Sequence, residues 1–299
     1  MKNVEGKVAV VTGGASGVGL GMVRVFLQAG MRVAVTDIRA DFLASAASEL
    51  EGHGSAVQFF SMDVTNRPQV AQVADQIESF FGSVDVLCNN AGVSSWLPVD
   101  VATFEDWDWM LGVNLGGVVN CVVTFLPKLM KNPEGGHIVN TASMAGLTPL
   151  PSWGTIYTTS KFAVRGLSDS LRLAMGPHGI GVTCLCPGLT RSNIRQSERT
   201  RPKDLASTTA LSSPQTSIAE VGMDPVELGA AVLRAIRCND AYVLAHAENR
   251  PGAVAEFEEV LSYFATEPVT DEGRLQFMAR FDENIRNAKA LQTRAPHAD

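Results

Sequence analysis

Short apolar runs alternate with longer stretches of helical period from the N-terminus to about residue 190, and this alternation restricts the possible folds more than any other feature. The apolar runs are hydrophobic almost continuously, as in strands buried on both faces of a parallel sheet. Strands that alternate with helices predict an α/β fold, a doubly wound parallel sheet with right-handed crossovers. We expect strands at 7–12, 32–36, 56–61, 84–88, 137–141 and 181–186, and helices at 17–29, 39–51, 66–81, 103–131 and 153–177.

No long linker divides the first 190 residues, and we expect one domain over 1–245 in this chain of 299 residues rather than two. Within that domain, residues 189–222 are rich in Ser, Thr and Arg, which is typical of a mobile lid over a substrate site. Residues 246–299 are expected to form a C-terminal helical extension packed on the same domain. The C-terminal elements we expect are a helix from Asp224–Pro225 to Arg237, a strand at 241–245, and helices at about 251–265 and 271–291.

Composition excludes several classes of function. Acidic residues outnumber basic ones by 31 to 24, so the chain lacks the broad basic surface that non-specific nucleic-acid binding requires. The longest apolar stretch, about 112–127, contains two asparagines and is too short to cross a membrane, and the N-terminus has no signal-peptide pattern. Neither the five histidines nor the five cysteines have metal-site spacing. We therefore expect a soluble, cytoplasmic protein with reduced thiols, no metal, and no nucleic-acid or membrane partner.

A glycine-rich run, TGGASGVG at residues 12–19, joins the first predicted strand to the first predicted helix. Glycines there allow a tight turn and close approach of the backbone to a pyrophosphate, and the helix N-terminus supplies free N–H groups for that anion. The spacing is GxxxGxG rather than GxGxxG. Placed between a strand and a helix, the run predicts a dinucleotide site, with a flexible turn as the simpler alternative.

Asp37 ends the second predicted strand, downstream of this loop. A carboxylate at that place accepts hydrogen bonds from the adenosine ribose hydroxyls and repels a 2′-phosphate, which favours NAD over NADP. Arg39 could instead contact a phosphate, and Asp37 could also cap the following helix. We expect NAD as the cofactor.

Tyr157 and Lys161 stand four residues apart in a predicted helix, so both side chains lie on one face. A nearby ammonium favours the phenolate and lowers the pKa of a tyrosine from about 10, which suits Tyr157 to acid–base work near neutral pH. An isolated YxxxK pair could also be a surface pair, so its meaning depends on the motifs around it.

Together these motifs have the order and spacing of the short-chain dehydrogenase/reductase family, which the chain resembles over roughly residues 5–245. The resemblance implies a Rossmann-like domain that interconverts an alcohol and a carbonyl compound with NAD(P)(H). It also implies a homodimer or homotetramer built from the helices at 103–131 and 153–177. The residues that carry the resemblance are Thr12–Gly19, Asn89–Gly92, Asn114, Ser143, Tyr157, Lys161 and Pro187–Gly188.

The resemblance assigns roles to four catalytic residues. Tyr157 would be the acid–base group, and Lys161 would lower its pKa and hold the nicotinamide ribose. Ser143 would hydrogen-bond the substrate oxygen, and Asn114 would anchor a water of the proton relay. Asn114 could instead fill a backbone gap at a helix kink, and Ser143 could be a turn residue. The interval from Ser143 to Tyr157 is one residue longer than is usual in the family.

The resemblance also implies a cofactor site drawn from loops after several strands. Asp63 and Val64 would lie at the adenine ring, and Thr190 would meet the nicotinamide carboxamide. Ser192 stands where the family usually has a threonine, and Asn89 could instead bridge neighbouring strands. The full expected set is Gly13, Ser16, Gly17, Val18, Gly19, Asp37, Asp63, Val64, Asn89, Asn90, Ala91, Gly92, Tyr157, Lys161, Pro187, Gly188, Thr190 and Ser192.

Loops that follow strand ends carry apolar and aromatic residues, which favours a bulky or aromatic secondary alcohol over a sugar. In the lid, Arg191 or Arg195 could meet a phenolate or carboxylate of the substrate, with a solvated charged face as the alternative. The expected substrate contacts are Ser95, Trp96, Met144, Trp153, Arg191 and Arg195.

A narrower resemblance connects the chain with the NAD-dependent Cα-dehydrogenases of bacterial lignin β-aryl ether breakdown. It rests on residues 112–118, 136–139 and 192–194, followed by Arg201–Pro202. It implies oxidation of a benzylic secondary alcohol to an aryl ketone. Two other functions stay open: an NADPH-dependent carbonyl reductase of the same family, against which Asp37 argues, and a non-catalytic NAD-binding regulatory protein.

Overall fold

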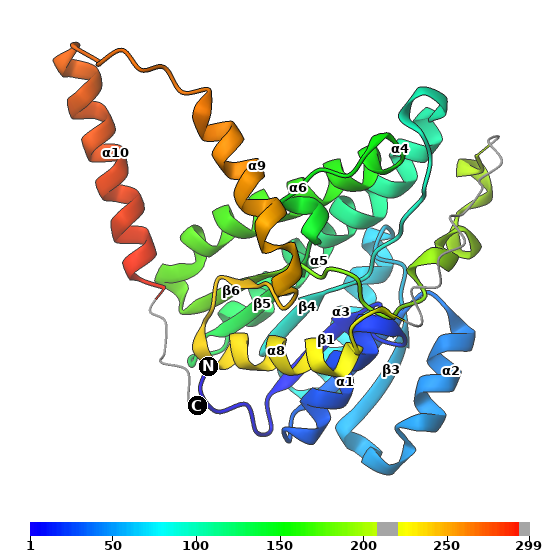
Figure 1. Cartoon of the computed structure of the whole chain (residues 1–299). Coiled ribbons are helices and arrows are strands. Elements are labelled where there is room, and N and C mark those ends of the chain that lie inside the picture. Colours follow the sequence, from blue (N-terminus) through cyan, green and yellow to red (C-terminus); the bar gives the residue numbers. More distant parts are fainter. Residues whose placement is uncertain (208–220, 293–299) are drawn as a thin grey trace.

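The computed structural model describes residues 1–207 and 221–292. Seven strands in these residues form one sheet in the order β3-β2-β1-β4-β5-β6-β7, with every neighbouring pair parallel (Figure 1). The order reverses between β1 and β4, and such a reversal opens a crevice at the carboxyl ends of the strands. The predicted doubly wound, Rossmann-like sheet is confirmed. The strands are β1 Val8–Thr12, β2 Arg32–Asp37, β3 Val57–Ser61, β4 Val86–Asn89, β5 Gly136–Thr141, β6 Ile180–Leu185 and β7 Tyr242–Val243.

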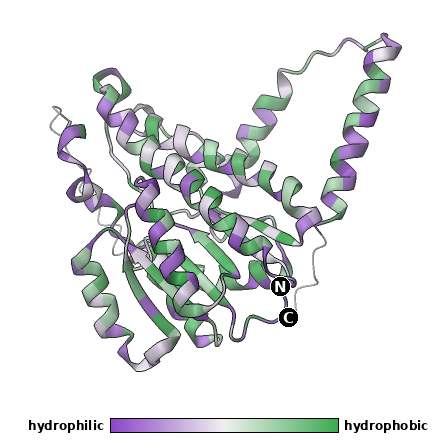
Figure 2. Ribbon diagram, turned by 180° about the vertical axis from the view of Figure 1, so that it is seen from behind, coloured by the Kyte–Doolittle hydropathy of each residue, from purple (hydrophilic) through white to green (hydrophobic). Residues whose placement is uncertain are grey.

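Helices cover both faces of this sheet (Figure 1). Phe26 of α1 and Val232 of α8 belong to the core on one face, and Ile77 of α3 and Phe125 of α5 to the core on the other. The strands between them are mostly hydrophobic (Figure 2), as buried parallel strands must be. The described helices are α1 Gly17–Gln28, α2 Ala40–Glu49, α3 Arg67–Phe81, α4 Phe104–Leu111, α5 Gly117–Met130, α6 Thr155–Met175, α8 Pro225–Cys238, α9 Arg250–Ser262 and α10 Glu272–Ala290.

Local chemistry explains where α3 and α8 begin and end. The side chains of Asn66 and Asp224 each accept a hydrogen bond from a backbone N–H in the first turn of their helix. Pro225 then fills the first position of α8, where a missing N–H costs nothing. At the other end of α3, Gly82 adopts a φ of 84°. Both helices begin and end within one residue of the predicted bounds.

The predicted helix at 103–131 is present, with a π-helical segment, Gly112–Gly116, between α4 and α5. The helical stretch Phe104–Met130 is longer than the apolar run at about 112–127 considered from the sequence, and by length and composition alone it could cross a membrane. The helix continues through its two asparagines because the backbone of Val93 satisfies Asn114 and that of Val64 satisfies Asn120. A core helix of a soluble protein meets the same criteria, and 44% of the apolar window is buried.

Residues 250–292 form an arm that leaves the domain with α9 and returns to it with α10 (Figure 1). The extension is helical as predicted, but neither helix has a buried residue, so it does not pack along the domain as we expected. Apolar side chains do not gather on one stripe of α9 as they do on α8, so α9 has no single face for packing. Near one end of the arm, the Phe257 ring lies 5.1 Å from the Arg165 guanidinium, and at the other end Gln292 Nε2 donates to the carbonyls of Arg172 and Ile180.

Part of the predicted lid, residues 208–220, lies outside the described residues. The described part before it is not an irregular loop, because Ile194–Thr200 and Lys203–Leu205 form 3₁₀ turns. All five cysteines are free and buried.

Candidate active site

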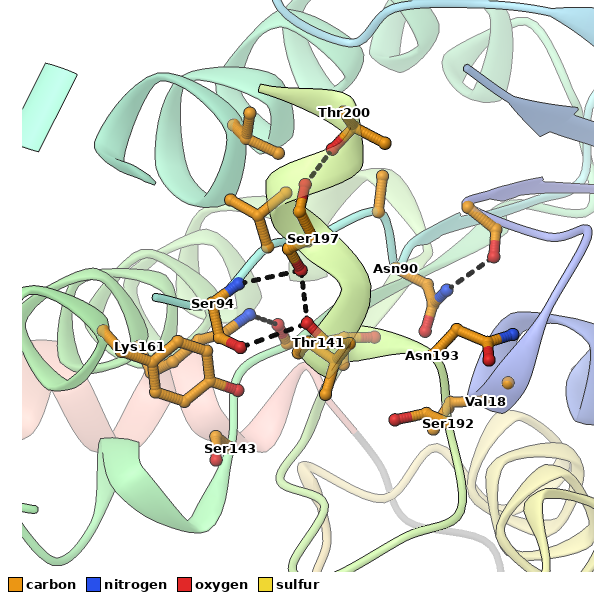
Figure 3. A pocket seen from close by; sticks show the side chains of 18 of the residues that line it. Val18, Asn90, Ser94, Thr141, Ser143, Lys161, Ser192, Asn193, Ser197 and Thr200 are labelled. Atoms are coloured by element: carbon orange, nitrogen blue, oxygen red, sulfur yellow. Dashed lines mark hydrogen bonds between the residues drawn. The ribbon is translucent and has the colours of Figure 1, made fainter. Parts of the chain in front are cut away.

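A cavity of about 580 Å³ opens at the carboxyl ends of the strands (Figure 3). The loops after β1 to β6 and the start of α6 supply its walls. The predicted residues that line it are Gly13, Ser16, Gly17, Val18, Asp37, Asp63, Val64, Asn90, Ala91, Gly92, Trp96, Ser143, Met144, Tyr157, Lys161, Pro187, Gly188, Thr190 and Ser192. The predicted residues outside its lining are Gly19, Asn89, Ser95, Asn114, Trp153, Arg191 and Arg195.

The glycine-rich loop forms a close-packed turn at one end of the cavity. Gly13 and Gly17 adopt φ values of 60° and 50°, and a Cβ at Gly13 would lie 2.9 Å from the Cα of Ala91. Gly19 turns away from the cavity, where a Cβ would lie 2.1 Å from the Gly13 carbonyl oxygen. Asn90 Nδ2 fixes the loop by donating to the carbonyls of Thr12 and Gly13, at 3.0 and 3.1 Å. The N-terminus of α1 therefore borders an open space that fits a pyrophosphate.

Asp37 lies at the end of β2 on the same side of the cavity. Its carboxylate accepts backbone N–H bonds from Ala15 at 3.3 Å and from Arg39 at 3.0 Å. Burial raises the pKa of Asp37, although these hydrogen bonds oppose the shift. The Arg39 guanidinium pairs with Asp41 and lies over the Phe42 ring at 4.2 Å. Asp37 thus organises its own turn and presents a carboxyl group to the cavity.

Tyr157, Lys161 and Ser143 meet near the middle of the cavity. Ser143 Oγ accepts a hydrogen bond from Ala145 N at 3.1 Å and donates to the Pro187 carbonyl at 3.4 Å. Lys161 Nζ donates to the Thr141 carbonyl at 3.0 Å and lies 5.5 Å from the centroid of the Tyr157 ring. A phenolic hydroxyl, an ammonium group and a small aliphatic hydroxyl therefore line one cavity.

The pKa values in this group differ from the prediction. Burial raises the pKa of Tyr157, and the hydrogen bond with Ser143 lowers it only in part. The predicted lowering by Lys161 was wrong for the protein alone, because the ammonium points to the Thr141 carbonyl and burial dominates. Burial also lowers the pKa of Lys161 to about 8, since its charged form is poorly solvated.

Asn114 and Asn89 lie behind the cavity wall and hold its framework. Asn114 Oδ1 accepts from Val93 N at 2.8 Å, and its Nδ2 donates to the Val93 carbonyl and to Ser160 Oγ. These bonds tie Asn114 to the loop after β4 and to α6 rather than to the backbone of its own helix, and the water-anchoring role stays a prediction. Asn89 Nδ2 donates to Asn140 Oδ1 at 2.8 Å, so Asn89 bridges β4 and β5 rather than facing the cavity.

Aromatic rings form the cavity wall beside Tyr157. The Trp96 ring lies 4.8 Å from that of Trp153 and 6.5 Å from that of Tyr157, measured between centroids. Trp153 supports Trp96 from outside the cavity, while Met144 lines it directly. Ser95 is buried beside Trp96 and does not reach the cavity.

The two predicted arginine contacts do not line the cavity. Arg191 pairs with Asp224, the residue that caps α8. Arg195 lies over the Trp96 ring, 5.9 Å from its centroid. A contact of Arg191 with a substrate therefore stays a prediction, and Arg195 contacts Trp96, which lines the cavity.

Sequence reasoning missed a buried ion pair that joins the segment after β6 to α4. Arg201 Nη2 lies 2.6 Å from Asp106 Oδ1 on α4, and both side chains are buried. Burial raises the pKa of Asp106, but hydrogen bonds from Thr103 and Arg201 outweigh burial and keep it below its usual value. Ser197 Oγ also accepts from Ser94 N at 3.1 Å (Figure 3). Asp106 follows a predicted helix start, and nothing in the sequence indicates that it pairs with Arg201, which is distant in the chain.

His246 was also missed, because it stands after the last strand with no motif around it. The residue is buried, and its Nδ1 accepts from Gly188 N at 3.0 Å, while its Nε2 lies 3.2 Å from the Leu189 carbonyl. It also leaves no room for a larger residue at position 188, where a Cβ would lie 2.7 Å from the His246 ring. His246 thus fixes the loop that carries Thr190.

Comparisons with known proteins agree with this geometry. The chain is 34% identical to a C alpha-dehydrogenase from Sphingobium sp. strain NBRC 103272 / SYK-6 over 282 residues, which are 92% of each chain. A short-chain dehydrogenase structure from Novosphingobium aromaticivorans matches with a TM-score of 0.84 and 37% identity, over 98% of this chain and 100% of that one. A short-chain dehydrogenase/reductase from Burkholderia phymatum in complex with NAD matches with a TM-score of 0.83 and 32% identity, over 91% and 100%.

The family model for short chain dehydrogenases matches residues 7–203, which hold the glycine-rich loop, Ser143, Tyr157 and Lys161. That range covers more than half of the chain. The chain therefore belongs to the short-chain dehydrogenase family.

Proposed function

We propose that this protein is an NAD-dependent oxidoreductase that interconverts a secondary alcohol and a ketone, acting on an aromatic, benzylic alcohol such as a lignin-derived β-aryl ether. The observation that carries the proposal is one cavity lined by Tyr157, Lys161 and Ser143 together with Asp37 and Trp96. This cavity therefore combines an acid–base group, a site for a dinucleotide and an aromatic wall.

The three catalytic residues divide the proton chemistry among them. Ser143 Oγ holds the substrate oxygen, and Tyr157 Oη takes the hydroxyl proton during alcohol oxidation. The carbinol carbon gives its hydride to bound NAD, which is the chemistry that the cofactor supplies. During ketone reduction, Tyr157 returns the proton to the carbonyl oxygen. The Lys161 ammonium favours the phenolate form of Tyr157, which is the form that accepts the proton during alcohol oxidation.

Asp37 supports NAD rather than NADP. A carboxylate beside the adenosine ribose accepts hydrogen bonds from its hydroxyls and repels a 2′-phosphate. The Arg39 charge, which could attract that phosphate, already pairs with Asp41. The NAD complex of the Burkholderia relative agrees with this preference.

The aromatic wall supports a benzylic substrate. Trp96 lines the cavity 6.5 Å from Tyr157, measured between ring centroids, so an aromatic substrate that contacts Trp96 would lie close to the tyrosine. The likeness to a C alpha-dehydrogenase over nearly the whole chain points to the same substrate class. We place the reaction in the cytoplasm, where five free cysteines stay reduced.

A spectrophotometric screen tests the proposal. Secondary alcohols, with β-aryl ether benzylic alcohols and aliphatic alcohols among them, are supplied with NAD or NADP while the reduced cofactor is followed by absorbance. We expect turnover with benzylic alcohols and NAD, and a loss of at least about 100-fold in kcat for Tyr157→Phe with NAD binding retained. Trp96→Leu should lower kcat/KM for benzylic alcohols about tenfold and spare aliphatic ones.

The same screen separates the alternatives. Higher kcat/KM with NADP, and faster reduction than oxidation, would identify a carbonyl reductase in which Arg39 could contact the 2′-phosphate. NAD binding without turnover on any alcohol or ketone would identify a regulatory protein.

A further inference from the structure

Asn249 brings the start of the C-terminal extension into the candidate active site. Among the residues that the structure describes, it is the only one after Leu205 that lines the cavity. Its Nδ2 packs against Gly188, because a Cβ added to that glycine would lie only 2.8 Å from it. The arm leaves the domain directly after this residue, with α9 (Figure 1). The extension therefore contributes a side chain to the cavity wall.

The side chain of Asn249 does not cap the helix that it precedes. Asparagine and aspartate are favoured N-cap residues, and Asn66 before α3 and Asp271 before α10 each accept a bond from a backbone N–H. Asn249 makes no such bond to α9, and its half-buried amide has no hydrogen-bond partner among the described residues. Both a donor and an acceptor thus stay available at the cavity wall.

The polar side chains on the lid side of the cavity are already hydrogen-bonded to the protein. Ser197 Oγ accepts from Ser94 N and donates to the Ile194 carbonyl. Thr200 Oγ1 donates in turn to the Ser197 carbonyl (Figure 3). A cavity of this kind relies on a small number of polar groups to orient its ligand. The free amide of Asn249 is therefore well suited to that task.

Asn249 and the serine of the proposed reaction border the same short segment, Pro187–Gly188. The Pro187 carbonyl accepts from Ser143 Oγ at 3.4 Å and from Met144 N at 2.9 Å. Asn249 covers the next residue, Gly188, and all five of these residues line the cavity. A substrate whose alcohol oxygen is held by Ser143 therefore lies beside the segment that Asn249 covers.

We propose that Asn249 is a specificity-determining residue that hydrogen-bonds an oxygen on the carbon next to the carbinol carbon of the substrate. This inference rests on the proposed function. An amide donates to an ether oxygen through Nδ2 and accepts from a hydroxyl group through Oδ1. Leu150 and Leu189 also line the cavity and offer no side-chain hydrogen bond, so the amide selects which substituent is favoured. Benzylic alcohols with a neighbouring ether or hydroxyl group are then preferred over those with a plain alkyl chain.

Pairs of benzylic alcohols of matched size, which differ by one oxygen, test this role. With NAD as the cofactor, α-(hydroxymethyl)benzyl alcohol is compared with α-ethylbenzyl alcohol, and α-(methoxymethyl)benzyl alcohol with α-propylbenzyl alcohol. Each pair gives a ratio of kcat/KM values, and comparison with the wild-type ratio cancels the intrinsic reactivity of the alcohols. Asn249→Leu removes the donor and the acceptor, so we expect both ratios to fall about tenfold, the value of one hydrogen bond. The KM for NAD and the kcat/KM for the alkyl alcohols should stay nearly unchanged.

Asn249→Asp separates the donor from the acceptor. A carboxylate accepts from a hydroxyl group but cannot donate to an ether, so the methoxymethyl ratio should fall about tenfold while the hydroxymethyl ratio is retained. Asn284→Leu is the matched control, because Asn284 is exposed on α10 and lies outside the cavity lining, and it should change neither ratio. Binding of NAD to each variant reports that the domain is folded.

The outcomes distinguish this role from the proposed function itself. Oxidation of all four alcohols, with ratios that Asn249→Leu leaves unchanged, would overturn this inference and leave the proposed function in place. An equal loss on all four would also overturn it, because a residue that only supports Gly188 would affect every substrate alike. If the wild type oxidises none of the four alcohols, the proposed function fails, and this inference fails with it.

Discussion

The carboxylate of Asp106 on α4 lies 2.6 Å from the guanidinium of Arg201, and both side chains are nearly inaccessible to water. The Arg201 guanidinium also lies over the Trp109 ring, 4.8 Å from its centroid. This buried pair fastens the segment after β6, whose residues Thr200 and Leu205 line the cavity, to the helix on the opposite side. We therefore expect this pair to set the width of the cavity at the end that we propose for the substrate.

Asp106→Asn should loosen the substrate end and spare the cofactor end. Removing one partner leaves the other charge buried and uncompensated, which costs about 3 kcal/mol of the free energy of unfolding. We expect a lower urea midpoint and a raised KM for the alcohol, with the KM for NAD nearly unchanged. Glu198→Gln is the control, because Glu198 also approaches Arg201 but is 40% exposed. Equal effects of the two substitutions would show that the buried pair has no special role.

His246 should govern cofactor binding through the backbone it holds. His246→Ala removes the acceptor for Gly188 N and frees the loop that carries Thr190. A lost hydrogen bond of this kind is worth about 1 kcal/mol, so we expect the KM for NAD to rise about fivefold. His246→Asn, whose Oδ1 can replace Nδ1 as the acceptor, should restore most of the affinity. His178→Ala, at an exposed turn, should change nothing, and an Asn variant as weak as the Ala variant would contradict this role.

The choice between NAD and NADP should depend on Asp37. Its carboxylate would make charge-assisted hydrogen bonds to the ribose, so Asp37→Ala should lower kcat/KM with NAD by roughly 10- to 100-fold. The same change removes repulsion of a 2′-phosphate, and kcat/KM with NADP should rise or stay level. Asp41→Ala separates this effect from that of Arg39, because it frees the guanidinium while leaving Asp37 in place. Parallel losses with both cofactors in Asp37→Ala would mean that Asp37 only shapes the turn.

Much of the fold follows from local signals. The strands and helices of the first 190 residues show the periodicities of buried strands and amphipathic helices, and caps such as Asn66 and Asp224 act within their own turn. The glycine-rich loop and the Tyr157–Lys161 pair are equally local, since backbone geometry and a four-residue spacing determine them. Each of these features could therefore be predicted before any tertiary contact was known.

The features that were missed depend on contacts between distant residues. Asp106 and Arg201, or Gly188 and His246, come together only when the sheet has formed. Arg191 seemed free to meet a substrate because its partner, Asp224, is remote in sequence. The apolar residues of the arm resembled those of a packed extension, and composition alone does not tell which surface covers them.

We expect Lys161 to lower the free energy of unfolding and to be required for the reaction. Its pKa falls to about 8 because burial disfavours the ammonium, and none of the described residues forms a salt bridge with it. The folded-state pKa lies below the unfolded value, so the penalty is fully present below about pH 8 and is relieved as pH rises toward the unfolded pKa of about 10.4. Lys161→Met should remove this burial penalty, although it also removes the hydrogen bond to the Thr141 carbonyl. We expect a net stabilisation of the folded protein by about 2 kcal/mol at pH 7.

Thermal and urea unfolding from pH 6 to pH 10, with kcat measured in parallel, test whether Lys161 lowers stability while supporting activity. The Lys161→Met protein should unfold at higher urea concentration than the wild type at pH 7, and the difference should shrink above pH 8. Its kcat should fall at least about 100-fold, because the phenolate of Tyr157 loses its cation. Lys131→Met, at a residue 68% exposed in its side chain, should alter stability by less than about 0.5 kcal/mol. A Lys161→Met protein that is less stable at pH 7 would show that the ammonium is well solvated in the folded state.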